Sequence, residues 1–133
     1  MALRLSADHL QDMVTHAGET FPHECCGLLA GRDGRVVRLY RGRNVDESPY
    51  TYRLDDRQLL QFLREMDQEG LDIVGIYHSH TASEATPSRT DVARAFYPEA
   101  VYVIISLQHP EHPVVRGFRI IDGTVAEEDV IVQ

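Results

Sequence analysis

Apolar residues along this chain fall into short runs that predict strands, separated by two stretches with the spacing of amphipathic helices. The predicted strands are rich in β-branched and aromatic residues and cover residues 2–5, 25–31, 35–40, 50–54, 71–77, 101–107, 114–121 and 124–132. Helices are expected after the first strand, before residue 70 and, as a short element, after residue 91. This order predicts an α/β domain in which a mixed β-sheet is flanked by helices.

The two longer helices have recognisable ends. The first begins at Ser6, whose hydroxyl can accept a hydrogen bond from a backbone N–H of the first turn. Its apolar face, at the spacing i, i+3, i+4, i+7, consists of Leu10, Met13, Val14 and Ala17. The second begins at Asp55 and ends at Gly70. His9 and His16 lie on or near the first helix without a third ligand nearby in sequence, so we expect surface or boundary positions for both.

Asp-Gly pairs at 33–34 and 122–123 predict two hairpin turns, because both residue types accept the positive φ that such turns require. Arginines occupy positions 32, 35, 38, 41 and 43 around the first turn, and they are the only local concentration of cations in the chain. Two interpretations of these arginines stay open. They are either solvated side chains spread over strand faces or a docking patch for an acidic partner.

Length and composition limit the classes of protein to which the chain can belong. Its 133 residues, 43% hydrophobic and 26% charged, suffice for one domain, which we place at residues 1–133. No apolar run approaches the roughly 20 residues needed to cross a bilayer, so no membrane partner is expected. The net charge of −8 argues against a nucleic-acid partner, because such binding depends on clustered cations that neutralise phosphates.

Cysteine usage points to a cytoplasmic protein. Cys25 and Cys26 are adjacent and cannot form an ordinary structural bridge with each other, and the chain contains no other cysteine. A secreted disulfide scaffold is therefore excluded, and a reducing compartment fits best. The neighbouring carboxylate of Glu24 disfavours a thiolate, so we predict that both cysteines are core thiols rather than nucleophiles.

The stretch that begins at His78 has the residues of a metal site. His78 and His80 end a predicted buried strand, and side chains two apart on a strand point to the same face. If the following loop folds back, Asp91 becomes a third ligand. Three nitrogen and oxygen ligands without a fourth are typical of a catalytic zinc site. The alternative is that the histidine spacing is accidental and that Ser88 and Asp91 only form a helix capping box.

Glu24, directly before a predicted buried strand, also has two interpretations. It is either an ordinary solvated carboxylate or a carboxylate whose pKa is raised by partial burial for proton transfer. Ser79 would point to the opposite face from the two histidines and would support the strand rather than bind a metal.

Together these residues resemble the JAMM (MPN+) zinc metallopeptidases. The pattern is Glu24, the His-Ser-His run at 78–80, seven residues, Ser88, two residues and Asp91. The resemblance extends over essentially the whole chain and is strongest to the small bacterial Mec-type enzymes. It implies a cytidine-deaminase-like JAMM/MPN core, in which the His-Ser-His histidines and Asp91 bind Zn²⁺. It also implies that Glu24 transfers protons and that Ser88 donates a hydrogen bond to the oxyanion.

The same resemblance implies a substrate. Mec-type enzymes act on the C-terminal Gly-Gly end of ubiquitin-like sulfur-carrier proteins and release newly made cysteine. Alternatives are a peptidase or deubiquitinase-like enzyme for another ubiquitin-like conjugate, or a non-catalytic MPN scaffold. From position alone, residues 81–86 are expected to line the groove for the substrate tail, and an exposed edge strand would permit a homodimer.

Overall fold

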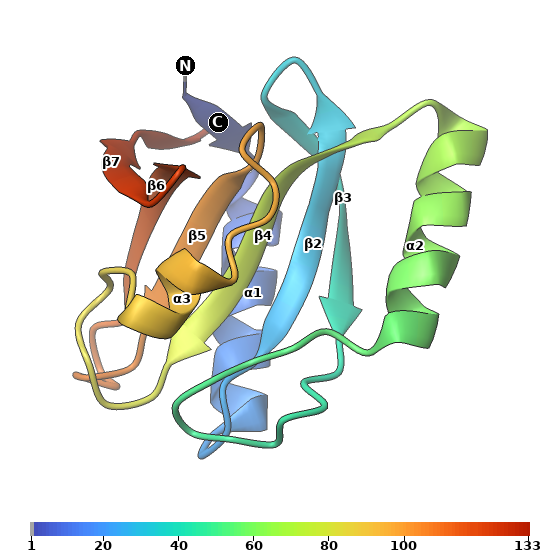
Figure 1. The fold of residues 1–133 in the computed structure, drawn as a ribbon. Coiled ribbons are helices and arrows are strands. Elements are labelled where there is room, and N and C mark those ends of the chain that lie inside the picture. The colour runs from blue at the N-terminus through green and yellow to red at the C-terminus, as the bar shows by residue number, and fades with distance from the viewer. Residues whose placement is uncertain (1) are drawn as a thin grey trace.

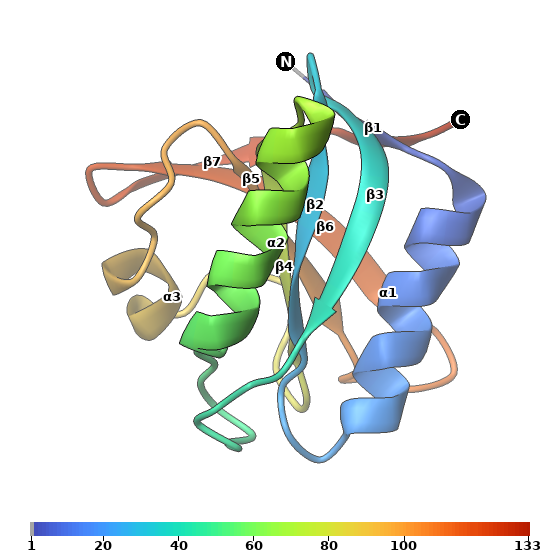
Figure 2. The same ribbon diagram turned by 90° about the vertical axis from the view of Figure 1, so that its right-hand side faces the viewer.

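The chain folds into one eight-stranded sheet with helices on both faces (Figures 1 and 2). The structure, a computed structural model, describes residues 2–133. Its elements are β1 (Leu3–Leu5), α1 (Ala7–Thr20), β2 (Cys26–Arg32), β3 (Arg35–Gly42), α2 (Asp56–Glu69), β4 (Asp72–His80), α3 (Arg89–Ala93), β5 (Val101–Ser106), β6 (Val114–Ile121), β7 (Thr124–Glu128) and β8 (Val130–Val132). The predicted α/β class is confirmed.

The sheet is mixed, with the strand order β7-β6-β5-β4-β2-β3-β1-β8. The pairs β1–β3, β1–β8 and β4–β5 are parallel and the others are antiparallel. The prediction of a single last strand over 124–132 is wrong. The strand is interrupted at Asp129, whose carbonyl accepts a hydrogen bond from the N–H of Leu3. As a result β7 and β8 lie at opposite ends of the strand order although they adjoin in sequence.

Each face of the sheet has its own hydrophobic core. Figure 2 shows α1 on one face and α2 with α3 on the other. The α1 core contains Met13 and Ala17, which pack with Leu29 and Val103 of the sheet. The core on the other face includes Phe62 and Met66 of α2, buried against strand residues. Because strand side chains alternate between faces, each central strand contributes to both cores.

The ends of the two longer helices are as predicted. The Ser6 hydroxyl accepts a hydrogen bond from the N–H of His9, and Asp55 caps α2 by accepting from the N–H of Arg57. Gly70 ends α2 in the left-handed conformation, with φ of 66°. No helix within residues 2–133 has both the length and the apolar character needed to span a bilayer.

The prediction of a surface or boundary position is wrong for His16. Its side chain is buried, and Nδ1 lies 2.7 Å from the hydroxyl of Tyr77 in β4. One face of α1 is pressed onto the sheet, and His16 lies on that face beside Ala17. The sequence contained no sign of this, because the partner is 61 residues away.

Residues 50–54 do not form the predicted strand. Apart from one isolated bridge between Asn44 and Leu54, they form an irregular segment. Several of its backbone groups bond to side chains instead: the Thr51 carbonyl accepts from the Asn44 amide and the Arg53 N–H donates to the Asn44 oxygen. Local β propensity therefore gave way to side-chain partners elsewhere in the fold.

The arginines around the first hairpin are paired within the molecule. Arg38 forms an ion pair with Glu69, Arg41 with Asp12 and Glu19, and Arg43 with Asp55. Arg32 and Arg35 donate to the Glu69 carbonyl and to the Gln133 side chain, respectively. Because these arginines have partners within the molecule and are spread along the hairpin, the structure favours solvated side chains on strand faces over a docking patch for an acidic partner.

Candidate metal centre

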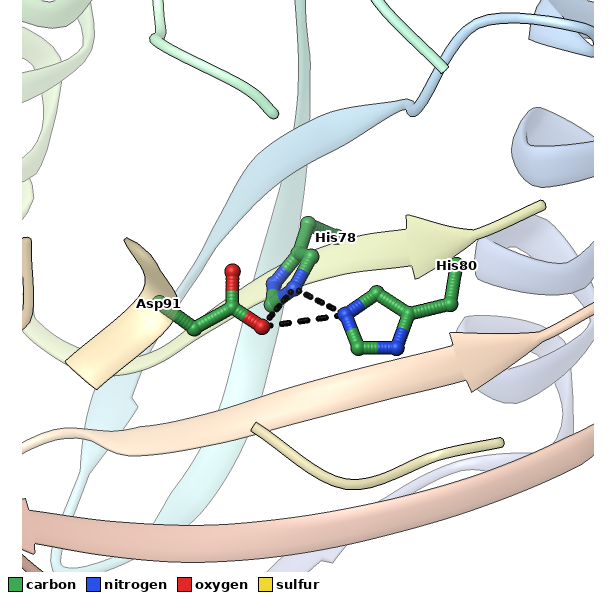
Figure 3. Close-up of side chains that lie close together, drawn as sticks. All are labelled: His78, His80 and Asp91. Atoms are coloured by element: carbon green, nitrogen blue, oxygen red, sulfur yellow. Dashed lines mark hydrogen bonds and ion pairs between the residues drawn. The ribbon is translucent and has the colours of Figure 1, made fainter. Parts of the chain in front are cut away.

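Three buried ligand atoms converge at the end of β4 (Figure 3). His78 Nε2 and His80 Nε2 lie 3.2 Å apart, and Asp91 Oδ2 lies 3.1 Å from the first and 3.0 Å from the second. The two imidazoles leave β4 on one face because they are two residues apart. All three side chains are at least 94% buried.

Asp91 reaches the histidines because the loop after β4 folds back and α3 begins there. The Ser88 hydroxyl accepts a hydrogen bond from the N–H of Asp91 at 3.0 Å, and the Asp91 carboxylate accepts from the N–H of Ser88 at 2.9 Å. This reciprocal capping box fixes the carboxylate at the start of α3. The same two side chains therefore cap α3 and place the Asp91 carboxylate beside the histidines.

The two imidazole rings are oriented by different neighbours. His80 Nδ1 lies 2.8 Å from the carbonyl oxygen of Glu84, to which it donates, and this bond orients the ring so that Nε2 faces Asp91. The ring of His78 is stacked on Tyr52, with ring centroids 4.4 Å apart. The sequence did not predict a place for Tyr52 beside the histidines, because it lies in the predicted strand 50–54.

The geometry of these residues fits a metal ion. Two ligand atoms about 2.0–2.1 Å from a tetrahedral zinc lie roughly 3.3 Å apart, close to the observed separations. Burial lowers the pKa of His78, which leaves its ring neutral. Burial alone would raise the pKa of Asp91, but hydrogen bonds from His78 and His80 hold it below its ordinary value. Two imidazoles and a carboxylate thus form a preassembled group compatible with a metal.

Glu24 lies beside this group as a buried acid. Its side chain is 2% exposed, and Oε1 has no hydrogen-bond partner among residues 2–133. Burial raises the pKa of the carboxyl to about 8; His80 lowers it, whereas the negative charge of Asp91 raises it further. Of the two interpretations offered by the sequence, the structure excludes the solvated carboxylate. A carboxyl with this pKa can exchange a proton near neutral pH.

The remaining residues near the site have supporting positions. Ser79 points away from the histidines, and its hydroxyl accepts a hydrogen bond from the N–H of Cys25 at 2.8 Å. Cys25 and Cys26 are buried and unpaired, and burial raises the pKa of each thiol to about 12. The prediction of core thiols is therefore confirmed.

Comparison with known families agrees with this geometry. The model for the prokaryotic homologues of the JAB domain, Prok-JAB, matches residues 6–121. The chain belongs to this family. The matched range includes Glu24, His78, His80, Ser88 and Asp91. The predicted JAMM-type relationship is thus confirmed.

Two curated relatives of this Prok-JAB chain have named activities. The CysO-cysteine peptidase of Mycobacterium tuberculosis is 46% identical over 130 residues, which cover 96% of this chain and 89% of that protein. The desampylase of Haloferax volcanii is 40% identical over 111 residues, which cover 78% of this chain and 80% of that protein.

Solved structures share the fold. The protein DSY2949 from Desulfitobacterium hafniense superposes with a TM-score of 0.88 at 37% identity, covering 98% of this chain and 92% of that one. A JAMM structure described as a metalloprotease-like zinc site in the proteasome and signalosome has a TM-score of 0.60 at 17% identity, covering 98% and 99%. The second likeness establishes the JAMM/MPN fold alone.

Proposed function

We propose that this protein is a zinc-dependent peptidase that hydrolyses the bond after the C-terminal Gly-Gly of a ubiquitin-like sulfur-carrier protein and releases cysteine. The observation that carries the proposal is the buried convergence of His78, His80 and Asp91 beside the unpartnered carboxyl of Glu24. The mycobacterial relative, a CysO-cysteine peptidase with 46% identity over nearly the whole chain, supports the choice of substrate.

Zinc is the proposed metal. Its usual ligands include imidazole and carboxylate, and catalytic sites have three protein ligands with one position left open, as His78, His80 and Asp91 provide. Bound there, zinc would supply Lewis acidity that polarises the scissile carbonyl and lowers the pKa of an attacking water. The JAMM structure with the related fold is described as a metalloprotease-like zinc site, which is consistent with this choice.

Glu24 is proposed as the group that moves protons. Its carboxylate takes a proton from the attacking water and delivers it to the leaving amine of the released residue. A pKa near 8 in the metal-free protein, caused by burial, suits this exchange, because an ordinary solvated carboxylate is too weak a base to hold the proton. Nothing hydrogen-bonds Oε1 among residues 2–133, so this oxygen is free to accept it.

Ser88 is proposed as the donor to the oxyanion. Its hydroxyl oxygen accepts a hydrogen bond from the N–H of Asp91, an interaction that leaves the hydroxyl hydrogen unused. That hydrogen can be donated to the oxygen on which negative charge develops during attack. The capping box holds Ser88 beside the ligand Asp91, close to where the substrate carbonyl must lie.

The substrate tail is proposed to bind in extended form along residues 81–86. Backbone pairing of this kind favours a thin Gly-Gly end, because side chains near the cleaved bond would need space. The loop is held in place from both sides: the Thr81 hydroxyl donates to the Pro49 carbonyl, and the Ser106 hydroxyl donates to the Ser83 carbonyl. We also propose a cytoplasmic location, which the buried, unpaired cysteines favour. A homodimer stays a prediction.

A second substrate class is supported by the Haloferax relative. That protein is named a desampylase and is 40% identical over 78% of this chain. The same ligand group and acid would then act on a conjugate of a ubiquitin-like protein with another protein. A non-catalytic scaffold is disfavoured, because this chain has all five residues to which the family assigns metal binding or catalysis: Glu24, His78, His80, Ser88 and Asp91.

A mass-spectrometric cleavage assay tests the proposal. Zinc-loaded protein and its Glu24→Gln variant are incubated with a sulfur-carrier protein extended by one cysteine after Gly-Gly. Loss of that cysteine with the unmodified protein but not with the variant is the expected result. Cleavage only of a carrier conjugated to another protein would favour the second class, and no cleavage of either substrate by the zinc-loaded protein would contradict the peptidase assignment.

A further inference from the structure

The segment of residues 44–54, called here the 44–54 segment, holds both backbone groups of Glu24. The N–H of Glu24 donates to the carbonyl of Ser48 at 2.9 Å, and the carbonyl of Glu24 accepts from the side-chain amide of Asn44 at 3.0 Å. Glu24 lies between α1 and β2 and belongs to neither. Its backbone is therefore positioned by a loop that is remote in sequence.

Asn44 organises this segment from its interior. The side chain is 6% exposed, and its second amide hydrogen is donated to the Thr51 carbonyl at 3.0 Å. Its oxygen accepts from the N–H groups of Asp46 and Arg53, both at 3.0 Å. A primary amide has two donors and two acceptor lone pairs, so Asn44 uses its full capacity. No other common side chain of this size offers the same set.

The 44–54 segment is also connected to the metal ligands. Tyr52 stacks on the ring of His78, and the Pro49 carbonyl accepts from Thr81, the residue after His80. Arg94, next to α3, donates to both the Asp46 carboxylate and the Tyr52 carbonyl. The segment that holds Glu24 is thus in contact with the elements that provide all three ligands.

We propose that Asn44 is a positioning residue that sets the place of the Glu24 carboxyl relative to the metal ligands. The inference rests on the proposed function and deepens it. Oε1 of Glu24 makes no hydrogen bond within residues 2–133, so backbone attachment and packing determine where this carboxyl lies. Displacement of a catalytic group by about 1 Å can cost about 10²-fold in rate, so loss of the Asn44 link should reduce turnover rather than substrate binding.

The main test variant is Asn44→Asp, which keeps the shape of the side chain and its acceptor oxygen. It replaces the amide NH₂ group with a carboxylate oxygen, which cannot donate to the carbonyls of Glu24 and Thr51. We expect kcat on the carrier–cysteine substrate to fall on the order of 10²-fold with KM and zinc affinity nearly unchanged. Asn44→Ala, which introduces no charge, should show the same division between kcat and KM. The matched control is Gln58→Ala, which removes a side-chain bond to the N–H of neighbouring Arg43 but has no link to Glu24.

A double-mutant comparison separates positioning from general support. In a Glu24→Gln background, measured under single-turnover conditions, Asn44→Asp should cost little more, because the group that it positions is already disabled. An equal loss of rate in both backgrounds would overturn the proposal. So would a parallel loss of zinc affinity, or a loss of kcat in Gln58→Ala as large as that in Asn44→Asp.

Amide hydrogen exchange gives a result that needs no turnover. Asn44→Asp should accelerate exchange at Glu24 and within the 44–54 segment while β4 stays protected, and Gln58→Ala should not accelerate exchange at Glu24. Unchanged exchange at Glu24 in Asn44→Asp would overturn the positioning role. If the unmodified protein cleaves no conjugate, the proposed function fails, but the exchange comparison still decides whether Asn44 holds Glu24.

Discussion

At the scale of single residues, the site contains a carboxyl that is held where its charged form is disfavoured. Burial raises the pKa of Glu24 to about 8, and the nearby negative charge of Asp91 acts in the same direction. In the unfolded chain the same group has an ordinary pKa near 4.5. The free energy of unfolding of the metal-free protein therefore depends on pH, because the pKa of this group differs between the folded and unfolded states.

The sign of this cost leads to a prediction for Glu24→Gln. Between pH 4.5 and 8 the folded state keeps a proton that the unfolded state has lost, so stability contributed by this group falls as pH rises. The neutral amide lacks this dependence. We expect the metal-free variant to gain stability over the unmodified protein from near zero at pH 4 to on the order of a few kcal/mol at pH 8. Urea denaturation with chelator present measures it, and a pH-independent difference would contradict it.

Ser88→Ala tests the oxyanion donor. Removing one such donor commonly lowers kcat by about 10²–10³-fold, and KM should change little because the bond forms mainly in the transition state. Zinc content should persist, because the ligand atoms themselves remain. Thr90→Ala, two residues further along the chain in α3, serves as the control. A Ser88→Ala variant with normal kcat would remove Ser88 from the mechanism.

At the scale of elements, β4 and its neighbour β2 form the rigid frame of the site. The two strands are antiparallel with Cys26 opposite His78, so the entrance to β2, where Glu24 lies, adjoins the end of β4, where His78 and His80 lie. The Ser79 hydroxyl accepts from the N–H of Cys25 and extends this pairing by one residue. Glu24 is thereby brought to the histidines by strand register.

Ser79→Ala should weaken this connection. The buried N–H of Cys25 would lose its acceptor, and an unsatisfied buried donor costs about 1–3 kcal/mol. We expect a lower free energy of unfolding by that amount, measured by urea denaturation, together with reduced kcat. Ser83→Ala makes the same substitution at an exposed side chain and should leave the free energy of unfolding nearly unchanged. Equal stability of the two variants would show that the Ser79 bond contributes nothing measurable.

At the scale of the whole molecule, α1 is joined to β4, the strand that ends at His80, through the buried pair of His16 and Tyr77. Burial and the charge of Arg41 lower the pKa of His16, while Asp12 and Glu19 oppose this effect. His16 is therefore neutral in the folded protein at a pH where it is partly charged in the unfolded chain. The fold as a whole should respond to mild acid through this residue.

The predicted contribution of His16 is a loss of stability as pH falls below about 6.5, the ordinary pKa of histidine, and it is opposite in sign to the contribution of Glu24 in the metal-free protein. The unfolded state then binds a proton at this histidine that the folded state does not bind, so the contribution of His16 to the free energy of unfolding decreases. His16→Gln should have lower stability at pH 8, and its deficit relative to the unmodified protein should shrink between pH 7 and 5. Thermal denaturation across this range measures both proteins, and parallel profiles would rule out His16 as the source.

Much of the fold was predictable because its signals are local. Strand patterns around His78, the Ser6 and Asp55 caps, and the Gly70 end depend on residues a few positions apart. The β propensity of residues 50–54 was misleading, because its backbone groups found side-chain partners such as Asn44 and Arg94. Packing of this kind overrides local preference and leaves no periodic signal.

The sequence by itself determined the order of the main elements, the identity of the three candidate ligands and the presence of an acid before a buried strand. Periodicity and capping express the covalent geometry of neighbouring residues, so they are visible in one dimension. Only the tertiary structure decided that Glu24 is buried beside the candidate ligands, that Tyr52 contacts His78 and Asn44 contacts Glu24, that His16 is a core residue and that β7 and β8 lie at opposite edges. These facts depend on contacts between segments far apart in the chain, which form only when the two cores pack against the sheet.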